Sequence, residues 1–259
     1  ALITGGDSGI GRAFTIGFAK EGASVVVAYL DEHEDAKETQ KLIEAEGREC
    51  LLIAGDIGSE EFCRSMVSNA ISSFGRLDIV VNNAGLSISK SLEEHTEKDW
   101  DLLYDVLVKG QFLVTQGAVN IMKKQALGGD VLNIVSKNAL VSGPNNAGYG
   151  SAKAAQLHLS RLNAAELGAD KIRVNVINPD AVIADSKIWA GGWAEGRAKA
   201  YGVKVEELPE FYAKRTLLNE IILPEDIANA SFAFVGGLLR KSTGNMLNVD
   251  GGVAMAFGR

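Results

Sequence analysis

The sequence is poor in the side chains that form disulfide frameworks and metal centres. It has two cysteines, Cys50 and Cys63, and three histidines among 259 residues. Two cysteines are too few for a disulfide framework, which indicates a reducing cytoplasm as the compartment. The histidines (His33, His95 and His158) are scattered and show none of the spacings of metal ligands, so we expect no metal.

Long apolar runs and an excess of basic charge are also missing. No apolar run approaches the length of a membrane span, and no secretory signal opens the chain. Acidic residues outnumber basic ones by 33 to 26, for a formal charge of −7, which argues against a nucleic-acid surface. We therefore expect neither a membrane nor a nucleic acid as partner. The composition, 46% hydrophobic and 23% charged, is that of an ordinary globular chain.

Short apolar runs alternate with amphipathic stretches along the chain. The runs are continuously hydrophobic, which is typical of parallel strands covered by helices on both faces. The pattern predicts an α/β fold with a single doubly wound parallel sheet (a Rossmann fold), as one domain over residues 1–259. The expected strands lie within 1–4, 24–30, 50–55, 77–85, 131–136, 172–179 and 245–252, and the expected helices include 10–21, 33–46, 60–74 and 149–167.

One segment, residues 185–223, breaks this rhythm with a helical pattern and no strand. We expect a helical insertion there, with regular winding resuming at Pro224, a favourable first residue for a helix. The insertion is interpreted either as a lid that closes over substrate or as a helical hairpin for subunit contact. The residues concerned are Trp189, Trp193, Arg197 and Arg215.

A glycine-rich stretch, "TGGDSGIGRA", follows the first apolar run. Gly5, Gly9 and Gly11 allow a tight turn and a close backbone approach to a pyrophosphate at the N-terminus of the next helix. Such a turn by itself can be purely structural. Its position between the first strand and the first helix favours a dinucleotide site, because the fold binds its dinucleotide there.

A second stretch, "IVSKNALVSGPNNAGYGSAK" (134–153), contains Tyr149 and, one helical turn later, Lys153, with Ser136 thirteen residues before the tyrosine. A free phenol, with a pKa of about 10, is a poor base near neutrality. An ammonium about 4 Å away is worth roughly 4 kcal/mol at an effective dielectric constant near 20, or about three pKa units. We therefore expect Lys153 to bring the pKa of Tyr149 near 7, where general acid–base catalysis is efficient.

These motifs together resemble those of the short-chain dehydrogenases/reductases (SDRs), and the resemblance spans essentially the whole chain. It rests on the glycine-rich turn, on "NNAG" at 82–85, on an aspartate after the third strand and on the Ser…Tyr-x-x-x-Lys set. It implies a nicotinamide cofactor and catalysis by Ser136, Tyr149 and Lys153, with Lys153 also holding the nicotinamide ribose. The cofactor-binding residues that it implies are Gly5, Asp7, Ser8, Gly9, Ile10, Gly11, Tyr29, Leu30, Asp56, Ile57, Asn83, Ala84, Gly85, Tyr149, Lys153, Pro179, Asp180 and Val182.

Two positions depart from the family pattern. Leu107 stands where the family has an asparagine that helps a water relay protons to the lysine. Our hypothesis is that the Leu107 backbone carbonyl, or a nearby polar group such as Asn138, takes over. The threonine that contacts the carboxamide in the family's segment after strand six is also absent, and Val182 or Ser186 is expected to replace it.

The second apolar run ends in "AYLDEHED", which contains several acids. An NADP enzyme needs a cation near the adenosine 2′-phosphate, and Arg12 is the only nearby cation in the sequence. The sequence therefore predicts NAD as cofactor, with NADP as the alternative.

The rear half resembles the dehydrogenase part of bifunctional rhamnulose-1-phosphate aldolase/lactaldehyde dehydrogenases, in "YDVLVKGQF", "IVSKNALVSGPNNAGY", "INPDAVIADSKIW" and "LLNEIILPEDIA". This resemblance implies lactaldehyde as substrate and a fused or associated aldolase domain. The sequence starts at Ala1 without methionine and enters a strand at once, so we expect residues upstream. The front half is nearer to glucose-dehydrogenase-like reductases, and part of the insertion is similar to sorbitol-6-phosphate dehydrogenases.

The expected partner is therefore a small-molecule substrate. Donors suited to a hydroxylated or anionic substrate surround the Ser–Tyr segment, with a solvated loop as the alternative. The substrate candidates are Lys137, Asn138, Asn145 and Trp189. A sugar, polyol or polyol phosphate is the alternative substrate, and an NAD-binding sensor or scaffold without turnover is the alternative function. The resemblance implies a homotetramer or homodimer built partly on helix 149–167.

Overall fold

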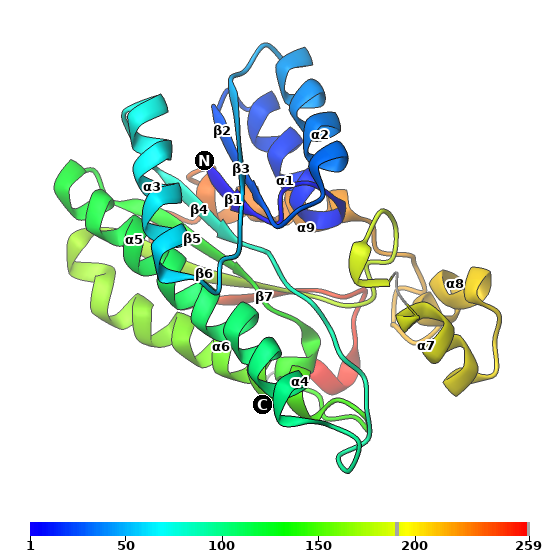
Figure 1. Cartoon of the computed structure of the whole chain (residues 1–259). Coiled ribbons are helices and arrows are strands. Elements are labelled where there is room, and N and C mark those ends of the chain that lie inside the picture. Colours follow the sequence, from blue (N-terminus) through cyan, green and yellow to red (C-terminus); the bar gives the residue numbers. More distant parts are fainter. Residues whose placement is uncertain (190–191, 258–259) are drawn as a thin grey trace.

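Alternating strands and helices build one seven-stranded parallel sheet in the computed structural model, which describes residues 1–189 and 192–257 (Figure 1). The strand order is β3-β2-β1-β4-β5-β6-β7. This confirms the doubly wound Rossmann arrangement. The strands are β1 (Leu2–Thr4), β2 (Val25–Tyr29), β3 (Cys50–Ala54), β4 (Ile79–Asn82), β5 (Gly129–Ile134), β6 (Ile172–Pro179) and β7 (Met246–Val249).

Helices cover both faces of the sheet. One face packs against α1 (Gly9–Lys20), α2 (His33–Ala45) and α9 (Pro224–Val235), and the other against α3 (Glu60–Phe74), α5 (Gly110–Gln125) and α6 (Ala147–Leu167) (Figure 1). Successive strand residues point to opposite faces. Leu2 therefore belongs to the apolar core under α3 and α5, and Ile3 to the core under α1 and α9.

The element boundaries follow the sequence pattern closely. Pro224 is the first residue of α9, as its fixed φ angle favours. The expected strands 77–85 and 245–252 end earlier, at Asn82 and Val249. After β7 the chain turns at Gly251 and Gly252, whose φ angles of 66° and 85° no strand residue adopts.

The insertion forms two short helices, α7 (Trp193–Tyr201) and α8 (Leu208–Ala213), and its described residues contain no strand. The two helices stand away from the sheet (Figure 1). They have a small core of their own, made by Ala194, Ala198, Leu208 and Tyr212. On the same side of the molecule, α4 (Glu97–Tyr104) runs through a π-helical turn (Asp105–Lys109) into α5.

Single 3-10 turns complete the structure. They are Lys137–Ala139, Gly168–Asp170, Lys187–Trp189, Val205–Glu207 and Ala254–Ala256. Among the described residues, no helix combines the length and the apolar composition that crossing a bilayer requires.

The chain reverses its direction of winding between β1 and β4, which lie side by side. At the carboxyl ends of these strands Thr4 and Asn83 bind each other's backbone. Thr4 Oγ1 accepts hydrogen bonds from the Asn83 and Ala84 N–H groups at 3.0 and 3.1 Å, and Asn83 Nδ2 donates to the Thr4 and Gly5 carbonyls at 3.1 and 3.0 Å. Doubly wound sheets bind ligands in the crevice at such a reversal.

A buried chain of polar side chains fixes β4, β5 and α6 relative to one another. Asn82 Nδ2 donates to Asn133 Oδ1 at 2.8 Å, and Asn133 Nδ2 donates to Ser160 Oγ, also at 2.8 Å. Asn133 is completely buried and Ser160 is 1% exposed. Because β5 leads to Ser136 and α6 contains Tyr149 and Lys153, this chain of hydrogen bonds sets the positions of the candidate catalytic residues.

We predict that Asn133→Ala lowers the free energy of unfolding by roughly 2–4 kcal/mol. It removes two buried hydrogen bonds and leaves one N–H of the Asn82 amide without an acceptor, while Asn82 keeps Thr115, and Ser160 keeps Gln111 and Gln156. An unsatisfied buried group costs about 1–3 kcal/mol, and a lost hydrogen bond about 1 kcal/mol. Urea unfolding followed by circular dichroism measures this change. Asn120→Ala, on the exposed side of α5, is the control and should have little effect. Equal stabilities for the two variants would contradict the prediction.

Candidate active site

The glycine-rich turn between β1 and α1 is shaped by contacts that only glycine permits. Gly5 and Gly9 have φ angles of 61° and 49°, in the left-handed region. A Cβ atom at Gly11 would collide with the Gly5 carbonyl oxygen. The turn therefore lies directly against the start of α1, with its backbone N–H groups at the positive end of that helix.

A cavity of about 400 Å³ opens over this turn. It lies at the carboxyl ends of β1, β2 and β4, where the sequence predicts a dinucleotide. The predicted cofactor residues that line it are Gly5, Asp7, Ser8, Gly9, Ile10, Tyr29, Leu30, Asp56, Ile57, Asn83, Ala84 and Gly85. Gly11 backs the turn instead, and Pro179, Asp180 and Val182 line a second cavity. The shape and the backbone donors fit a dinucleotide, whose adenosine end would lie toward Tyr29 and Asp56 if the sequence prediction holds.

One contact shows that a backbone N–H group of the turn can donate to an anionic oxygen. Asp185, in the loop after β6, accepts a hydrogen bond from the Gly9 N–H at 3.2 Å and one from Arg12 Nη1 at 3.1 Å. Its carboxylate oxygen stands in for an anionic oxygen at the N-terminus of α1. A pyrophosphate bound at this turn would have to displace Asp185 from Gly9.

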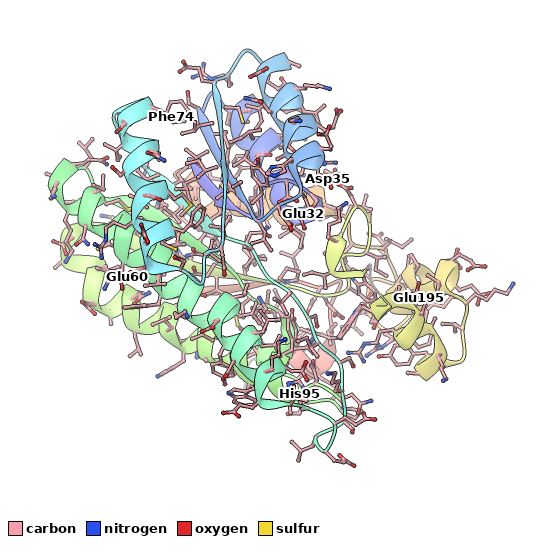
Figure 2. All side chains as sticks on the ribbon, viewed as in Figure 1. Glu32, Asp35, Glu60, Phe74, His95 and Glu195 are labelled. Carbon is pink, nitrogen blue, oxygen red and sulfur yellow. The ribbon has the colours of Figure 1, made fainter. Side chains whose placement is uncertain are left out.

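The adenosine end of this cavity has an acidic rim. Asp35 binds Lys187 Nζ at 2.7 Å and lies 3.6 Å from Arg12 Nη2. Figure 2 shows Glu32 and Asp35 on the side of α2 that faces the loop before α7. Arg12 is further held by the Asp7 carbonyl and by Thr39, so it is not free to approach a cofactor phosphate.

A second cavity, of about 510 Å³, adjoins the first and contains the candidate catalytic residues. Ser136, Tyr149 and Lys153 all line it, and Ile10, Asn83 and Gly85 line both cavities. Ser136 follows β5 at its carboxyl end, and Tyr149 and Lys153 project from the first turns of α6. The structure thus brings the three residues together at the junction of the two cavities.

The lysine of this group is held tightly. Lys153 is 4% exposed, and its Nζ donates to the Ile134 carbonyl at 3.1 Å. The same Nζ lies 5.6 Å from the centre of the Tyr149 ring. One helical turn therefore places the two side chains together, as the spacing predicts.

The expected pKa of Tyr149 is wrong for this structure. Burial raises the pKa of Tyr149 to about 12, and the hydrogen bond with Ser136 opposes this rise. Burial also lowers the pKa of Lys153 to about 7. The one-turn spacing lowers the pKa of Tyr149 only if Lys153 is fully charged, but a lysine stripped of water and bonded to one carbonyl holds its proton weakly. At neutral pH the group in this pair that titrates is the lysine.

An ion pair that the sequence does not predict lines the second cavity. Lys137 Nζ and Asp180 Oδ2 are 2.6 Å apart, and their side chains are 10% and 11% exposed. Lys137 follows Ser136 and Asp180 follows Pro179, and β5 and β6 are neighbours in the sheet. Strand adjacency would have been the signal for this pair. The reading of Lys137 as part of a solvated loop is therefore corrected.

The other predicted substrate residues also line the second cavity. Asn138 is partly buried and Asn145 is exposed, with a φ angle of 59°. Trp189 packs edge-on against the Tyr212 ring at 5.4 Å. Ser186, which the sequence offers as a replacement for the missing threonine, lines both cavities.

Leu107 lies in the π-helical turn and is completely buried. It belongs to an apolar cluster with Leu103 and Ala152, against which Tyr149 packs. The side chain thus fills with methyl groups the place where the family has an amide. Because the Gly110 N–H bonds to the Asp105 carbonyl across five residues, main-chain groups near Leu107 are displaced from the α-helical pattern.

The lowered pKa of Lys153 predicts a distinctive pH dependence of stability. Its folded pKa, about 7, lies below its ordinary value of 10.5, so the unfolded chain binds more protons between these values. Its contribution to stability therefore rises with pH between about 7 and 10.5. We expect Lys153→Met, which removes the buried charge, to be more stable than wild type at pH 7, by an amount on the order of a few kcal/mol.

Thermal unfolding at pH 7 and pH 10 measures this effect. The advantage of Lys153→Met should shrink as the pH rises, since the wild-type lysine becomes neutral in the folded state first. A difference in melting temperature that stays constant over this range would contradict the prediction.

Comparison with known proteins places this geometry among known enzymes. A family model described as "Enoyl-(Acyl carrier protein) reductase" matches residues 5–254. "Uncharacterized oxidoreductase YuxG" of Bacillus subtilis is 44% identical over 260 residues, which is 100% of this chain and 38% of that relative. An oxidoreductase of Thermotoga maritima is 36% identical over 251 residues, covering 97% of this chain and 95% of the relative.

The structure agrees with these matches. The crystal structure of carveol dehydrogenase from Mycobacterium avium in complex with NAD superposes with a TM-score of 0.91 at 25% identity, covering 98% of this chain and 96% of that one. The sheet order, the glycine-rich turn and the Ser–Tyr–Lys group at the junction of two cavities are all present in this chain. The chain belongs to the short-chain dehydrogenase/reductase family of nicotinamide-dependent oxidoreductases.

Proposed function

We propose that the protein moves hydride between NAD and a small hydroxylated alcohol or aldehyde, with the oxidation of lactaldehyde to lactate as first candidate. The observation that supports a catalytic role is the position of Ser136, Tyr149 and Lys153 at the junction of the two cavities. When bound, the nicotinamide supplies the hydride acceptor or donor. The chain has to supply the proton chemistry.

The proton balance assigns a task to each residue. Oxidation of R₂CHOH gives R₂C=O, one hydride and one proton, and oxidation of an aldehyde hydrate, RCH(OH)₂, gives RCOOH with the same hydride and proton. Ser136 hydrogen-bonds the substrate oxygen, and the Tyr149 oxygen takes the proton from it while giving up its own hydroxyl proton to neutral Lys153. Because the pKa of Tyr149 is about 12 and that of Lys153 about 7, Tyr149 passes the proton on and the Lys153 side of the pair stores it.

Replacing the phenol tests this role. We expect Tyr149→Phe to lower kcat for alcohol oxidation by roughly 10²–10⁴-fold, the usual worth of a positioned acid or base. NAD binding, followed by tryptophan fluorescence, should remain because the ring and the cofactor cavity persist. Wild-type kcat/KM for oxidation should rise with pH up to about 7 and then level, since the pair must accept a proton. Unchanged turnover in Tyr149→Phe would contradict the mechanism.

The substrate is tested with a panel of lactaldehyde, sugars and polyols under NAD reduction. Lactaldehyde is proposed first because four segments of the rear half resemble the dehydrogenase part of rhamnulose-1-phosphate aldolase/lactaldehyde dehydrogenases. A longer polyol or polyol phosphate is the second candidate, because a three-carbon aldehyde fills only a small part of a 510 Å³ cavity. Binding of NAD without turnover across the whole panel would favour the sensor instead.

The acidic rim of the adenosine end supports NAD over NADP. Glu32 lines the cofactor cavity, and the two cations beside it, Arg12 and Lys187, are already paired with Asp35. A 2′-phosphate would meet negative charge there and no free cation in the part of the chain that the structure describes.

We predict a lower KM for NAD than for NADP. Asp35→Asn should narrow this difference by about tenfold, because it releases Lys187 toward the cavity and removes one negative charge. Steady-state kinetics with both cofactors at constant ionic strength measure the ratio. Glu34→Gln is the control, because Glu34 is exposed and pairs with Lys37 on the same helix. A ratio that favours NADP in the wild type would overturn the assignment.

We further propose that the protein works in the cytoplasm as a homodimer or homotetramer built partly on α6, beside a fused or associated aldolase. Cys50 and Cys63 are both free thiols, which suits a reducing compartment. Leu162 on α6 and Phe112 on the adjacent α5 are 53% and 44% exposed, which suits an apolar contact between subunits.

A further inference from the structure

The second cavity has the opposite charge to the protein as a whole. The chain carries a formal charge of −7, yet four of the five lysine, arginine, aspartate and glutamate side chains that line this cavity are basic. Lys153 serves the proposed chemistry and Lys137 is paired with Asp180. Arg197 and Arg215, both from the insertion, have neither of these roles.

Arg197 lies on α7 with its guanidinium carbon 4.5 Å from the centre of the Trp193 ring. Its Nε is buried and has no hydrogen-bond acceptor among residues 1–189 and 192–257. A buried N–H of a cation without an acceptor costs free energy that a bound anion would recover. This makes Arg197 a donor prepared for a ligand.

Arg215 follows α8 and lies over other aromatic rings of the insertion. Its guanidinium carbon lies 5.1 Å from the centre of the Tyr212 ring, and its Nη1 is 3.4 Å from the Tyr201 hydroxyl. Stacking on aromatic rings holds a guanidinium in place while leaving its edge available. Within the described chain, neither this arginine nor Arg197 has a carboxylate within 4.0 Å, although eleven other lysines and arginines do.

The two arginines act on the same hydroxyl group. Burial would raise the pKa of Tyr201, but its hydrogen bond with Tyr212 and the charges of Arg197 and Arg215 lower it overall. Both guanidinium groups and both tyrosines line the same cavity, and Arg215 Nη1 is within 3.4 Å of the Tyr201 hydroxyl. Because the Tyr212 hydroxyl donates to Tyr201, two cations and the Tyr201 hydroxyl proton are the donors left for an anionic oxygen group.

We infer that Arg197, Arg215 and the Tyr201 hydroxyl bind a carboxylate or phosphate that the substrate carries at the end away from the carbon that exchanges hydride. The site lies in the cavity that Tyr149 also lines, so substrate bound at Tyr149 has room to extend toward the insertion. This inference rests on the proposed oxidoreductase function and names its substrate class. In an acidic protein, a basic cavity also attracts anionic substrates selectively.

Matched substrates separate an anion site from arginines that only pack against aromatic rings. Glyceraldehyde and glyceraldehyde 3-phosphate form the phosphate pair, and butyraldehyde and succinic semialdehyde form the carboxylate pair. In wild type we expect the charged member of at least one pair to have a kcat/KM at least tenfold higher than its neutral partner. The pair that shows the difference identifies the anion.

Single variants locate the effect. Arg197→Gln and Arg215→Gln should each raise KM for the charged substrate at least tenfold, or about 1.4 kcal/mol, with little change in kcat or in the kinetics of the neutral partner. Lys199→Gln on α7 and Lys214→Gln beside Arg215 are exposed matched controls and should behave as wild type. Equal losses for charged and neutral substrates in the arginine variants would overturn the inference.

A binding measurement without catalysis gives an independent readout. Inorganic phosphate or succinate should raise the melting temperature of the wild-type protein and of Tyr149→Phe, but not that of the Arg197→Gln/Arg215→Gln double variant. No ligand-dependent difference between wild type and the double variant would contradict the inference. Turnover of neutral substrates with no preference for charged ones would sink the anion site alone, whereas turnover that survives in Tyr149→Phe would sink the proposed mechanism alone.

Discussion

The buried ammonium of Lys153 is the interaction on which the candidate site depends. Its hydrogen bond to the Ile134 carbonyl joins α6 to the carboxyl end of β5, next to Ser136. Burying this group costs free energy, and the same cost lowers its pKa to about 7, where it can exchange a proton near neutrality. The Asn82–Asn133–Ser160 hydrogen bonds hold β5 and α6 in register. Their contribution to stability offsets part of the free-energy cost of burying Lys153.

Charge is distributed unevenly along the two joined cavities. At the adenosine end, Asp35 neutralises Lys187 and lies close to Arg12, and Glu32 adds a further negative charge. At the insertion end, Arg197 and Arg215 face the cavity without carboxylate partners in the described chain. A cofactor without a 2′-phosphate and a substrate with an anionic group would each meet complementary charge. The Lys137–Asp180 pair, which also lines the second cavity, is neutral overall.

The insertion can serve this purpose because it is a small packed unit. Its helices share the core of Ala194, Ala198, Leu208 and Tyr212, and its aromatic rings support the two arginines. The loop leading to it carries Asp185, which occupies the Gly9 N–H where a pyrophosphate oxygen is expected. Binding at the glycine-rich turn and the position of this loop are therefore linked through one carboxylate.

The sequence by itself determined the sheet, the order of its elements and the insertion, because hydrophobic periodicity, the glycines at 5, 9 and 11 and Pro224 are local signals. It also determined which residues gather at the carboxyl edge, since every parallel strand ends there. Only the tertiary structure decided the pKa values of Tyr149 and Lys153, because they depend on burial and not on the one-turn spacing. The tertiary structure also decided three further contacts: the Lys137–Asp180 pair, the Arg12–Asp185 pair and the common cavity of Arg197 and Arg215. Each of them brings together residues that are more than ten positions apart in the sequence, which no local pattern encodes.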